Sequence, residues 1–536
     1  MDGKNEWTLM FYLAGDNLLA PGMISQLKAI KDAGFHENTT VLVYFDPGEI
    51  GAPTRLFEVN RQRKKEKRFQ IGDGNDPFVR NLIEDEITAQ ILKATGGEAA
   101  SAIKREIITP DTIGAVESLT RFLNFCVDNH PAEHYMLFAI GHGNIVGNDA
   151  FLPDERPDTA IKLVELGSIL RDFTAKVKYT KGAFELLGLH SCSLSAVEVA
   201  YELQDTAKYM MATEGISFVG GWPYRQLLKK FFNTLEKAKD DKVEVDIKEL
   251  VRKLNNLCLH NATDFMFAGF SADISVCNLD PAKVTGLTTS LLGLTKALKD
   301  RLQDEQEKRR ILLAHWKSQS YWDESYTDLY DFCFCLNRIY EQDGVNDNPI
   351  KAACGEVMRT LDAPQRSDQF DALIVYSDHF GPTYQYSHGL SIYFPWSEPI
   401  ADGVQDILKN YREYAFTKAL EESSWVSFLE EYFRETRRAT REVEDGIMTD
   451  GLQESIDIAT GAFNGLVSNS SLALTDSSLA LTDNGSLSKP NPADSGGKPN
   501  PADSGGVSCS CASIKNYPRQ FSLSRRASEA YRLKDG

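Results

Sequence analysis

The stretch His134-Tyr-Met-Leu-Phe-Ala-Ile140 predicts a buried strand, and fifty residues later so does Phe184-Glu-Leu-Leu-Gly-Leu189. Both runs end abruptly, the first in Gly141-His142-Gly143 and the second in His190-Ser191-Cys192. Open α/β sheets place ligands at the edge where parallel strands end, so neighbouring strands would bring His142 and Cys192 to one cleft. A thiol beside an imidazole is the minimal equipment for nucleophilic catalysis, because the base supplies the thiolate that attacks.

Strand-like and helix-like segments alternate on both sides of these two runs. Further strands are predicted at 7–13, 39–45 and 209–213, and helices at 17–32, 112–129, 159–176 and 195–205. Residues 54–71 read as a hairpin. Alternation of this kind is typical of a parallel sheet that helices cover on both faces. The first part of the chain is therefore expected to be an α/β domain over residues 1–224.

The second half of the chain repeats the alternation. Helices are predicted at 225–260 and 281–318, strands at 275–279, 372–376 and 387–395, and one or two closing helices at 411–433. We expect residues 225–440 to form an additional α/β part of the same protein.

A repetitive tail is predicted for residues 441–536. Ser470-Ser-Leu-Ala-Leu-Thr-Asp476 recurs unchanged at 477–483, and Lys489-Pro-Asn-Pro-Ala-Asp-Ser-Gly-Gly497 recurs at 498–506. Segments of this composition bury too little apolar surface to offset the entropy lost on ordering. The sequence therefore favours a mostly flexible tail, which could act as a restraint or as a site of activating cleavage.

The composition narrows the class of protein. Hydrophobic residues make up 42% of the 536 residues and charged residues 25%, which is ordinary for a globular protein. A net charge of −19 argues against a nucleic-acid partner. The first residues contain no apolar stretch fit for a signal peptide, and no apolar run reaches transmembrane length. The nine cysteines follow no disulfide spacing, so a cytoplasmic location without a membrane partner is expected.

Six blocks of the sequence, in order over roughly residues 5–435, resemble the clostripain-type cysteine peptidases. They are Trp7 to Asn17, Gly141-His142-Gly143, Ser191-Cys192-Ser-Leu-Ser-Ala-Val-Glu198, Gly221-Trp222-Pro223-Tyr224, Asp328-Leu-Tyr-Asp-Phe332 and Gly389-Leu-Ser-Ile-Tyr-Phe-Pro395. The resemblance implies a caspase-like αβα sandwich with a mostly parallel central sheet. It also implies hydrolysis of protein or peptide substrates without a metal or other cofactor.

The resemblance assigns roles to particular residues. Cys192 would attack the scissile carbonyl, and His142 would protonate the leaving amine. The backbone N–H groups of Gly143 and Cys192 would stabilise the oxyanion, and Gly143 lets the backbone approach the substrate.

The substrate-binding segment departs from the family pattern. Relatives that cut after Arg or Lys usually carry an aspartate two residues before the nucleophile, where this chain has His190. Pro223, next to Trp222, occupies the place of a second acidic residue. Glu214 could supply a replacement charge. The candidate substrate-binding residues are therefore His190, Glu214 and Trp222, and the preference at P1 stays open between a basic residue and a neutral or acidic one read by His190.

Other residues that could carry chemistry have simpler explanations. The basic cluster at 61–68 is expected to be a solvated hairpin tip, with a self-cleavage site or partner patch as the alternative. Cys333 and Cys335 are expected in the core. Four carboxylates could group near a cation, but a solvated helix face is the expected explanation for Asp323, Glu324, Asp328 and Asp331.

The function that follows is a cytoplasmic cysteine endopeptidase. An intracellular peptidase must be restrained, so we expect activation by an upstream signal or protease, within an antiviral defence or cell-death cascade. Two alternatives remain. One is a non-catalytic scaffold with a caspase-like fold, and the other is a substrate of another protease that cleaves its tail.

Overall fold

The structure is a computed structural model of the whole chain. It describes residues 5–34, 36–46, 54–59, 113–144, 150–155, 157–261, 270–321, 325–361, 372–396, 407–419 and 425–444. The described elements up to Arg438 pack into one compact unit. The expected basic hairpin tip at 61–68 lies outside the described residues, and so does the predicted tail from residue 445 on. Residues 441–444, which were predicted to belong to the tail, form the end of a helix.

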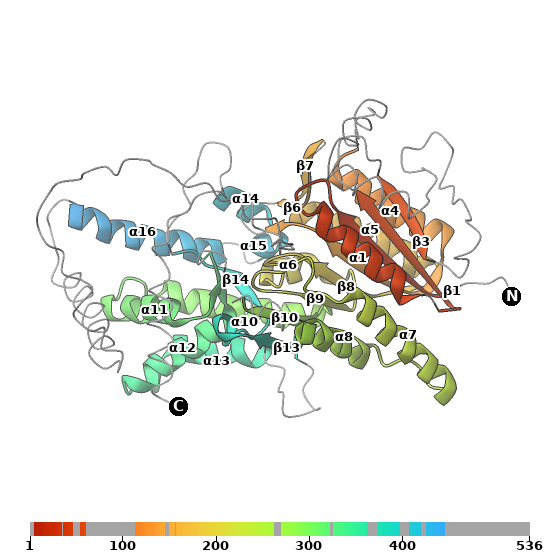
Figure 1. Cartoon of the computed structure of the whole chain (residues 1–536). Coiled ribbons are helices and arrows are strands. Elements are labelled where there is room, and N and C mark those ends of the chain that lie inside the picture. Colours follow the sequence, from red (N-terminus) through yellow and green to blue (C-terminus); the bar gives the residue numbers. More distant parts are fainter. Residues whose placement is uncertain are drawn as a thin grey trace, which may run out of the picture. The chain divides into compact units, whose positions relative to one another are not determined.

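An eight-stranded sheet forms the centre of the described fold, with strand order β13-β10-β9-β8-β4-β1-β2-β3 (Figure 1). Strands β9, β8, β4, β1 and β2 run parallel, while β3, β10 and β13 are antiparallel to their neighbours. The mostly parallel sheet predicted from the sequence is confirmed. The strands are β1 Asn5–Ala14, β2 Thr39–Asp46, β3 Arg55–Val59, β4 Ala132–Ile140, β8 Ala183–His190, β9 Tyr209–Ala212, β10 Ala272–Asn278 and β13 Ile374–Phe380.

Both faces of this sheet are buried. Strand β1 shows why: Leu9 and Phe11 belong to one apolar core, while Met10 and Tyr12 belong to the other, because successive side chains of a strand point to opposite faces. Helices α1 (Ala20–Ala33), α7 (Tyr224–Asp241) and α8 (Ile247–Asn261) supply the first core.

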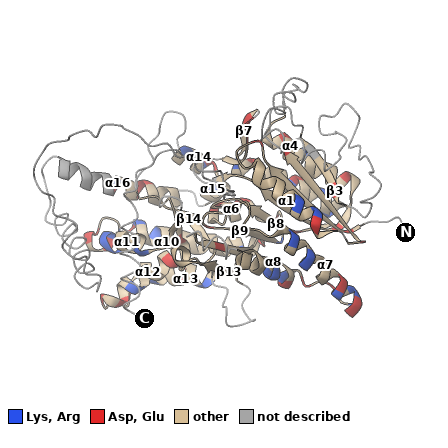
Figure 2. Ribbon diagram, in the orientation of Figure 1, with Lys and Arg blue, Asp and Glu red and all other residues tan. Residues whose placement is uncertain are grey.

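The other core extends from the sheet into a larger group of helices. They are α4 (Ala115–Asn129), α5 (Leu163–Tyr179), α6 (Val197–Glu202), α10 (Pro281–Lys299), α11 (Glu305–Lys317), α12 (Leu329–Gln342), α13 (Pro349–Leu361), α14 (Ile407–Glu413), α15 (Ala415–Ala419) and α16 (Trp425–Glu444). Lys, Arg, Asp and Glu lie mainly on the helices, with both signs along α7 (Figure 2). The central strands β1, β2, β4 and β8 carry one acidic residue each.

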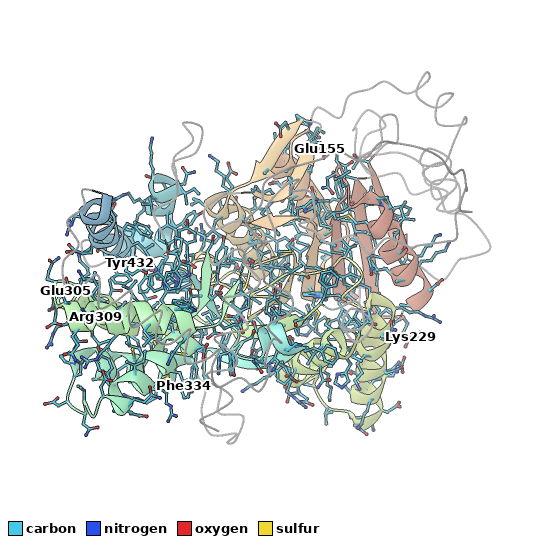
Figure 3. All side chains as sticks on the ribbon, turned by 60° about the vertical axis from the view of Figure 1, so that its left-hand side comes forward. Glu155, Lys229, Glu305, Arg309, Phe334 and Tyr432 are labelled. Atoms are coloured by element: carbon cyan, nitrogen blue, oxygen red, sulfur yellow. The ribbon has the colours of Figure 1, made fainter. Side chains whose placement is uncertain are left out.

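Side chains fill the space between the sheet and its helices (Figure 3). Figure 3 labels Tyr432 of α16, which is buried in the second core, and Phe334 of α12, which is 46% exposed. None of the described helices is long and apolar enough to cross a membrane.

The sheet continues across residue 224. Strands β10 and β13 come from the second half of the chain, and β10 pairs with β9 from Ser275 opposite Ala212 to Asn278 opposite Tyr209. The predicted division into 1–224 and 225–440 therefore falls inside one continuous sheet. It stays a prediction about how the chain is organised.

Several boundaries differ from those expected. The helix predicted at 159–176 begins at Leu163, because Asp158–Ile161 forms β7 against β6 (Ala150–Glu155). The backbone N–H of Lys162 donates to Glu165 Oε2 (2.9 Å), which fixes the new helix start. β6 also pairs with β5 (Gly143–Asn144).

The strand predicted at 387–395 is only β14 (Ser391–Tyr393). It lies in a separate small sheet with β11 (Ser320–Tyr321) and β12 (Tyr326–Asp328).

The expected solvated face of acidic residues is wrong for the two members that are described. Asp328 and Asp331 are both buried. Asp328 caps α12 by accepting the N–H of Asp331 (2.7 Å), and Asp331 accepts the N–H of Gln319 (2.7 Å). Both carboxylates are therefore part of the interior. Cys333 and Cys335 are buried, as predicted.

Candidate active site

The two strand ends meet as the sequence predicted. β4 and β8 are neighbouring parallel strands, and Ile140 lies opposite His190. His142 and Cys192 therefore each lie two residues after this Ile140–His190 pair. The loops touch: Gly141 donates its N–H to His190 O (3.3 Å), and Ser191 Oγ donates to Gly141 O (2.5 Å).

Gly143 lies against the loop that carries the cysteine. A Cβ at this position would be 2.7 Å from Ser191 Cβ and 3.4 Å from Cys192 O. A side chain would push the loop away, so the close approach requires glycine. His142 itself is half-buried, and its carbonyl accepts the N–H of Leu152 (2.9 Å).

The Cys192 side chain is 0% exposed. Its Sγ lies 3.3 Å from the backbone N of Ser217, which donates to it, and 3.7 Å from the Ser217 carbonyl, to which the thiol donates. Ser217 belongs to the loop that follows β9. A substrate can reach the thiol only if residues that cover it move.

The loop after β8 is clamped to the loop after β9. Ser193 donates its N–H to Gly215 O (3.0 Å), Ser195 donates to Thr213 O (2.9 Å), and Thr213 Oγ1 donates to Ser191 O (3.2 Å). Ser193 has a positive φ of 54°, a conformation that side-chain-bearing residues adopt at a cost of about 1–3 kcal/mol. The contacts to the second loop hold this strained turn directly after Cys192.

His190 lies inside the fold, 2% exposed. Its ring stacks on Trp222 with centroids 4.6 Å apart. Nε2 lies 2.8 Å from Phe218 O, and Nδ1 lies 2.8 Å from Tyr224 Oη. Because a carbonyl only accepts, Nε2 carries the proton and Nδ1 accepts from the tyrosine. Burial lowers the pKa of His190 to about 4, so the ring is neutral near pH 7.

Glu214 is also fully buried. Its Oε2 accepts the N–H of Gly389 (2.8 Å) and the hydroxyl of Tyr321 (3.2 Å). Burial, with the charges of Asp328 and Asp273 added, raises the pKa of Glu214 well above its usual range. The side chain therefore connects parts of the interior, and its burial favours the neutral form.

A narrow hollow begins beside Ser217. Its free space is about 20 Å³, enough for one water molecule. Of the three residues that the sequence assigned to substrate binding, only Trp222 lines it. The walls are mostly apolar, and the residues that form them include Ile216, Phe218, Leu259, Ile274 and, as the one carboxylate, Asp273.

This arrangement equips the site for covalent catalysis by a thiol with a neighbouring imidazole. Among the described residues, no group of three or more His, Cys, Asp and Glu side chains is placed to hold a metal ion. The roles of Gly143 and Cys192 as oxyanion donors stay a prediction.

No pattern in the sequence indicates that the loop after β9 holds the loop that carries Cys192. Gly215, Ser217 and Asp273 carry no motif, and their contacts join residues more than twenty positions apart.

Comparison with known proteins agrees with these features. The family model of the clostripain family of C11 peptidases matches residues 11–432. The chain belongs to the clostripain family. The resemblance noted in the sequence is thereby confirmed, and with it the caspase-like αβα fold expected of this family of cysteine peptidases.

Individual relatives of this clostripain-family protein are distant. Clostripain from Hathewaya histolytica is 21% identical over 380 residues, which is 62% of this chain. The chain spans 65% of that relative's length, slightly under two thirds.

Two solved structures are similar over 78% of this chain and 99% of their own. One is a secreted C11 cysteine protease from Bacteroides thetaiotaomicron in complex with an irreversible peptide inhibitor (15% identity, TM-score 0.45). The other is an inactive zymogen C11 protease from Parabacteroides distasonis (16% identity, TM-score 0.44).

Proposed function

We propose that this protein is a cysteine endopeptidase in which Cys192 is the nucleophile and His142 the general acid and base. The observation that carries the proposal is the placement of both residues two positions beyond one rung of neighbouring parallel strands. Family membership supports the same assignment.

The proposed reaction has two steps. The Cys192 thiolate attacks the carbonyl carbon of the scissile peptide bond, and His142 gives a proton to the leaving amine. Water then hydrolyses the acyl-enzyme, with His142 as the base. The backbone N–H groups of Gly143 and Cys192 would bind the oxyanion, where one donor is worth about 3 kcal/mol.

We further propose that the peptidase is regulated. The covered thiol of Cys192 supports a resting state that an upstream signal or protease must open. A cytoplasmic location is supported by the seven described cysteines, which are all free thiols. A role in an antiviral defence or cell-death cascade extends this proposal by analogy with other intracellular caspase-like peptidases.

For the P1 residue we propose a neutral, apolar side chain. The neutral ring of His190 has both nitrogens occupied, which leaves no cation to attract an acidic residue. The carboxyl of Glu214 is directed at Gly389 and Tyr321. The hollow beside Ser217 is lined mainly by aromatic and aliphatic groups, and both oxygens of its one carboxylate, Asp273, accept backbone N–H groups.

Replacement of the dyad tests the proposed activity. We expect Cys192→Ala and His142→Ala each to lower peptide cleavage by at least about 10³-fold, because the two groups act as one unit. Cys126→Ala, at another buried cysteine in α4, is the matched control and should retain activity. Cleavage is followed on a mixed peptide library and on the chain itself by mass spectrometry. A Cys192→Ala protein that still cleaves would rule out the assigned nucleophile.

The same library tests the P1 proposal. Cleavage sites of the active protein should be dominated by aliphatic or aromatic residues at P1. A dominant preference for Arg or Lys, or for Asp or Glu, would contradict the proposal for the pocket and leave the nucleophile assignment intact.

A further inference from the structure

A cluster of three buried carboxylic acids lies behind the loop that follows β9. Glu214 belongs to this loop, Asp273 to β10 and Asp328 to β12, and all three side chains are buried. We refer to these three residues as the acid cluster. The catalytic step proposed above does not use any of them, and like charges in so small a space repel unless protons or donors compensate them.

Asp273 has the contacts of a carboxylate. Its Oδ2 accepts the backbone N–H of Glu214 (2.6 Å), and its Oδ1 accepts the N–H of Gly215 (3.0 Å). Both oxygens therefore face donors, an arrangement that the ionised form satisfies and a protonated form would disturb. Burial raises the pKa of Asp273 to about 7 although these two N–H donors lower it, so the carboxylate is the main form above pH 7. Asp273 fixes the backbone of the loop at two successive residues.

Asp328 also has the contacts of a carboxylate. One oxygen accepts the N–H of Asp331 (2.7 Å), and the other accepts the N–H of His388 (2.5 Å). The His388 ring lies 3.5 Å from the first oxygen. Although burial alone would lower it, the charge of Asp328 raises the pKa of His388 to about 9, so the ring is a cation near pH 7.

Glu214 has the contacts of a neutral acid. Its Oε2 accepts from Gly389 and Tyr321, but among the described residues no donor faces Oε1. The adjacent backbone N–H groups of His388 and Gly389 donate to Asp328 and to Glu214, respectively, so the two carboxyl groups lie close together. Asp328 already has a donor at each oxygen, and a second negative charge beside it is unfavourable, so Glu214 takes the neutral form.

Short contacts connect the acid cluster to the nucleophile. The carbonyl of Gly215 accepts the N–H of Ser193, the residue after Cys192, and the N–H of Ser217 donates to Cys192 Sγ. On the other side, the Gly389 carbonyl accepts from Ser195 Oγ (2.7 Å). Gly389 has a φ of +101°, and a Cβ there would lie 2.9 Å from Ser275 Cβ, so the connection requires glycine.

We propose that Glu214, as a neutral acid, and Asp273, as a carboxylate, are positioning residues that together hold the loop after β9 against the Cys192 turn. The proposal rests on the proposed function. Ionisation of Glu214 would place a second negative charge beside that of Asp328, and the loop would release Cys192. The charged or titratable groups that face Glu214 are Asp273 from β10, Asp328 from β12, Tyr321 from β11 and, through Asp328, His388 and Asp331.

Amide variants distinguish the two protonation states. Gln can replace a neutral Glu214, because its amide adds no charge beside Asp328 and its oxygen can still accept from Gly389. Asn cannot replace an ionised Asp273, since its N–H₂ would face a backbone N–H. We expect Glu214→Ala to lower kcat about tenfold with little change in KM. Glu214→Gln should keep most of the wild-type kcat. Asp273→Asn should lower kcat about tenfold or more.

The controls are Glu244→Gln and Asp172→Asn, two exposed acids that should keep wild-type kcat. The pH profile is the deciding readout. Wild-type kcat should fall at alkaline pH as Glu214 ionises, and this fall should be absent in Glu214→Gln.

The rate at which iodoacetamide alkylates Cys192 is measured in parallel at each pH, because it reports on the Cys192 turn even if no peptide is cleaved. A wild type that cleaves no peptide, either alone or after incubation with cell extract to supply an activator, would overturn the proposed function, while alkylation still decides on the acid cluster.

Two results would overturn the positioning role: folded Asp273→Asn with wild-type kcat and alkylation rate, or Glu214→Gln as impaired as Glu214→Ala. Should Asp273→Asn not fold, the two Glu214 variants decide alone.

Discussion

At the scale of single residues, the chemical state of a side chain here follows from which partners it meets. His190 stands where basic-specific relatives carry a carboxylate, and its ring is held between Trp222 and two hydrogen-bond partners. A carbonyl on one side and a hydroxyl on the other match a neutral imidazole. His190 therefore supports the wall formed by Trp222 and Phe218, and this support requires the neutral ring.

A pH-dependent stability follows for His190. Its folded pKa of about 4 lies below the ordinary 6.5, so the stabilisation is fully present above pH 6.5 and is lost as the pH falls through 4. The difference corresponds to roughly 3 kcal/mol. His190→Gln should lower the free energy of unfolding at pH 7 by about 1–3 kcal/mol and flatten its decline between pH 6.5 and 4. Denaturant titrations at several pH values measure this, with exposed His260→Gln as the control. An unchanged pH slope would contradict the buried, neutral assignment.

At the scale of elements, the sequence predicts strands well where the apolar run is continuous. The apolar runs and their polar endings were enough to predict β4 and β8. Because the two strands are parallel neighbours, the loops that carry His142 and Cys192 lie together. The short strands β5, β7 and β12 were missed, because four residues or fewer carry no periodicity.

The surroundings of the site could not be predicted because they depend on distant partners. Glu214 was expected to face the substrate as a replacement charge, yet the groups that hold it come from Gly389 and Tyr321, more than a hundred residues later. Asp328 was expected to be solvated and instead caps a helix in the interior. A lone acidic residue looks the same in sequence whether water or backbone N–H groups satisfy it.

At the scale of the whole molecule, the two halves of the chain share one sheet and one active-site support. β10 and β13 extend the sheet beyond β9, and α7 and α8 cover the face formed partly by β1 and β4. The acid cluster adds polar contacts between the loop after β9 and residues beyond 320. The proposed catalytic residues lie before residue 224, but part of the support of their loops comes from Asp273, Tyr321 and Gly389 beyond it.

This arrangement predicts that residues 1–224 do not fold alone. Without β10, strand β9 becomes an open edge, and without α7 and α8 the apolar side chains of Leu9 and Met136 are exposed to water. We expect a fragment 1–224 to aggregate or to lack near-ultraviolet circular dichroism. A fragment 1–444 should unfold in one cooperative transition, and we expect the same transition for these residues in the full chain. Thermal unfolding followed by circular dichroism compares the three proteins. A cooperative transition in the 1–224 fragment would show instead that its core is complete without the second half of the chain. In that case residues 1–224 would be an independent domain, to which Asp273 and Gly389 add further support for Cys192.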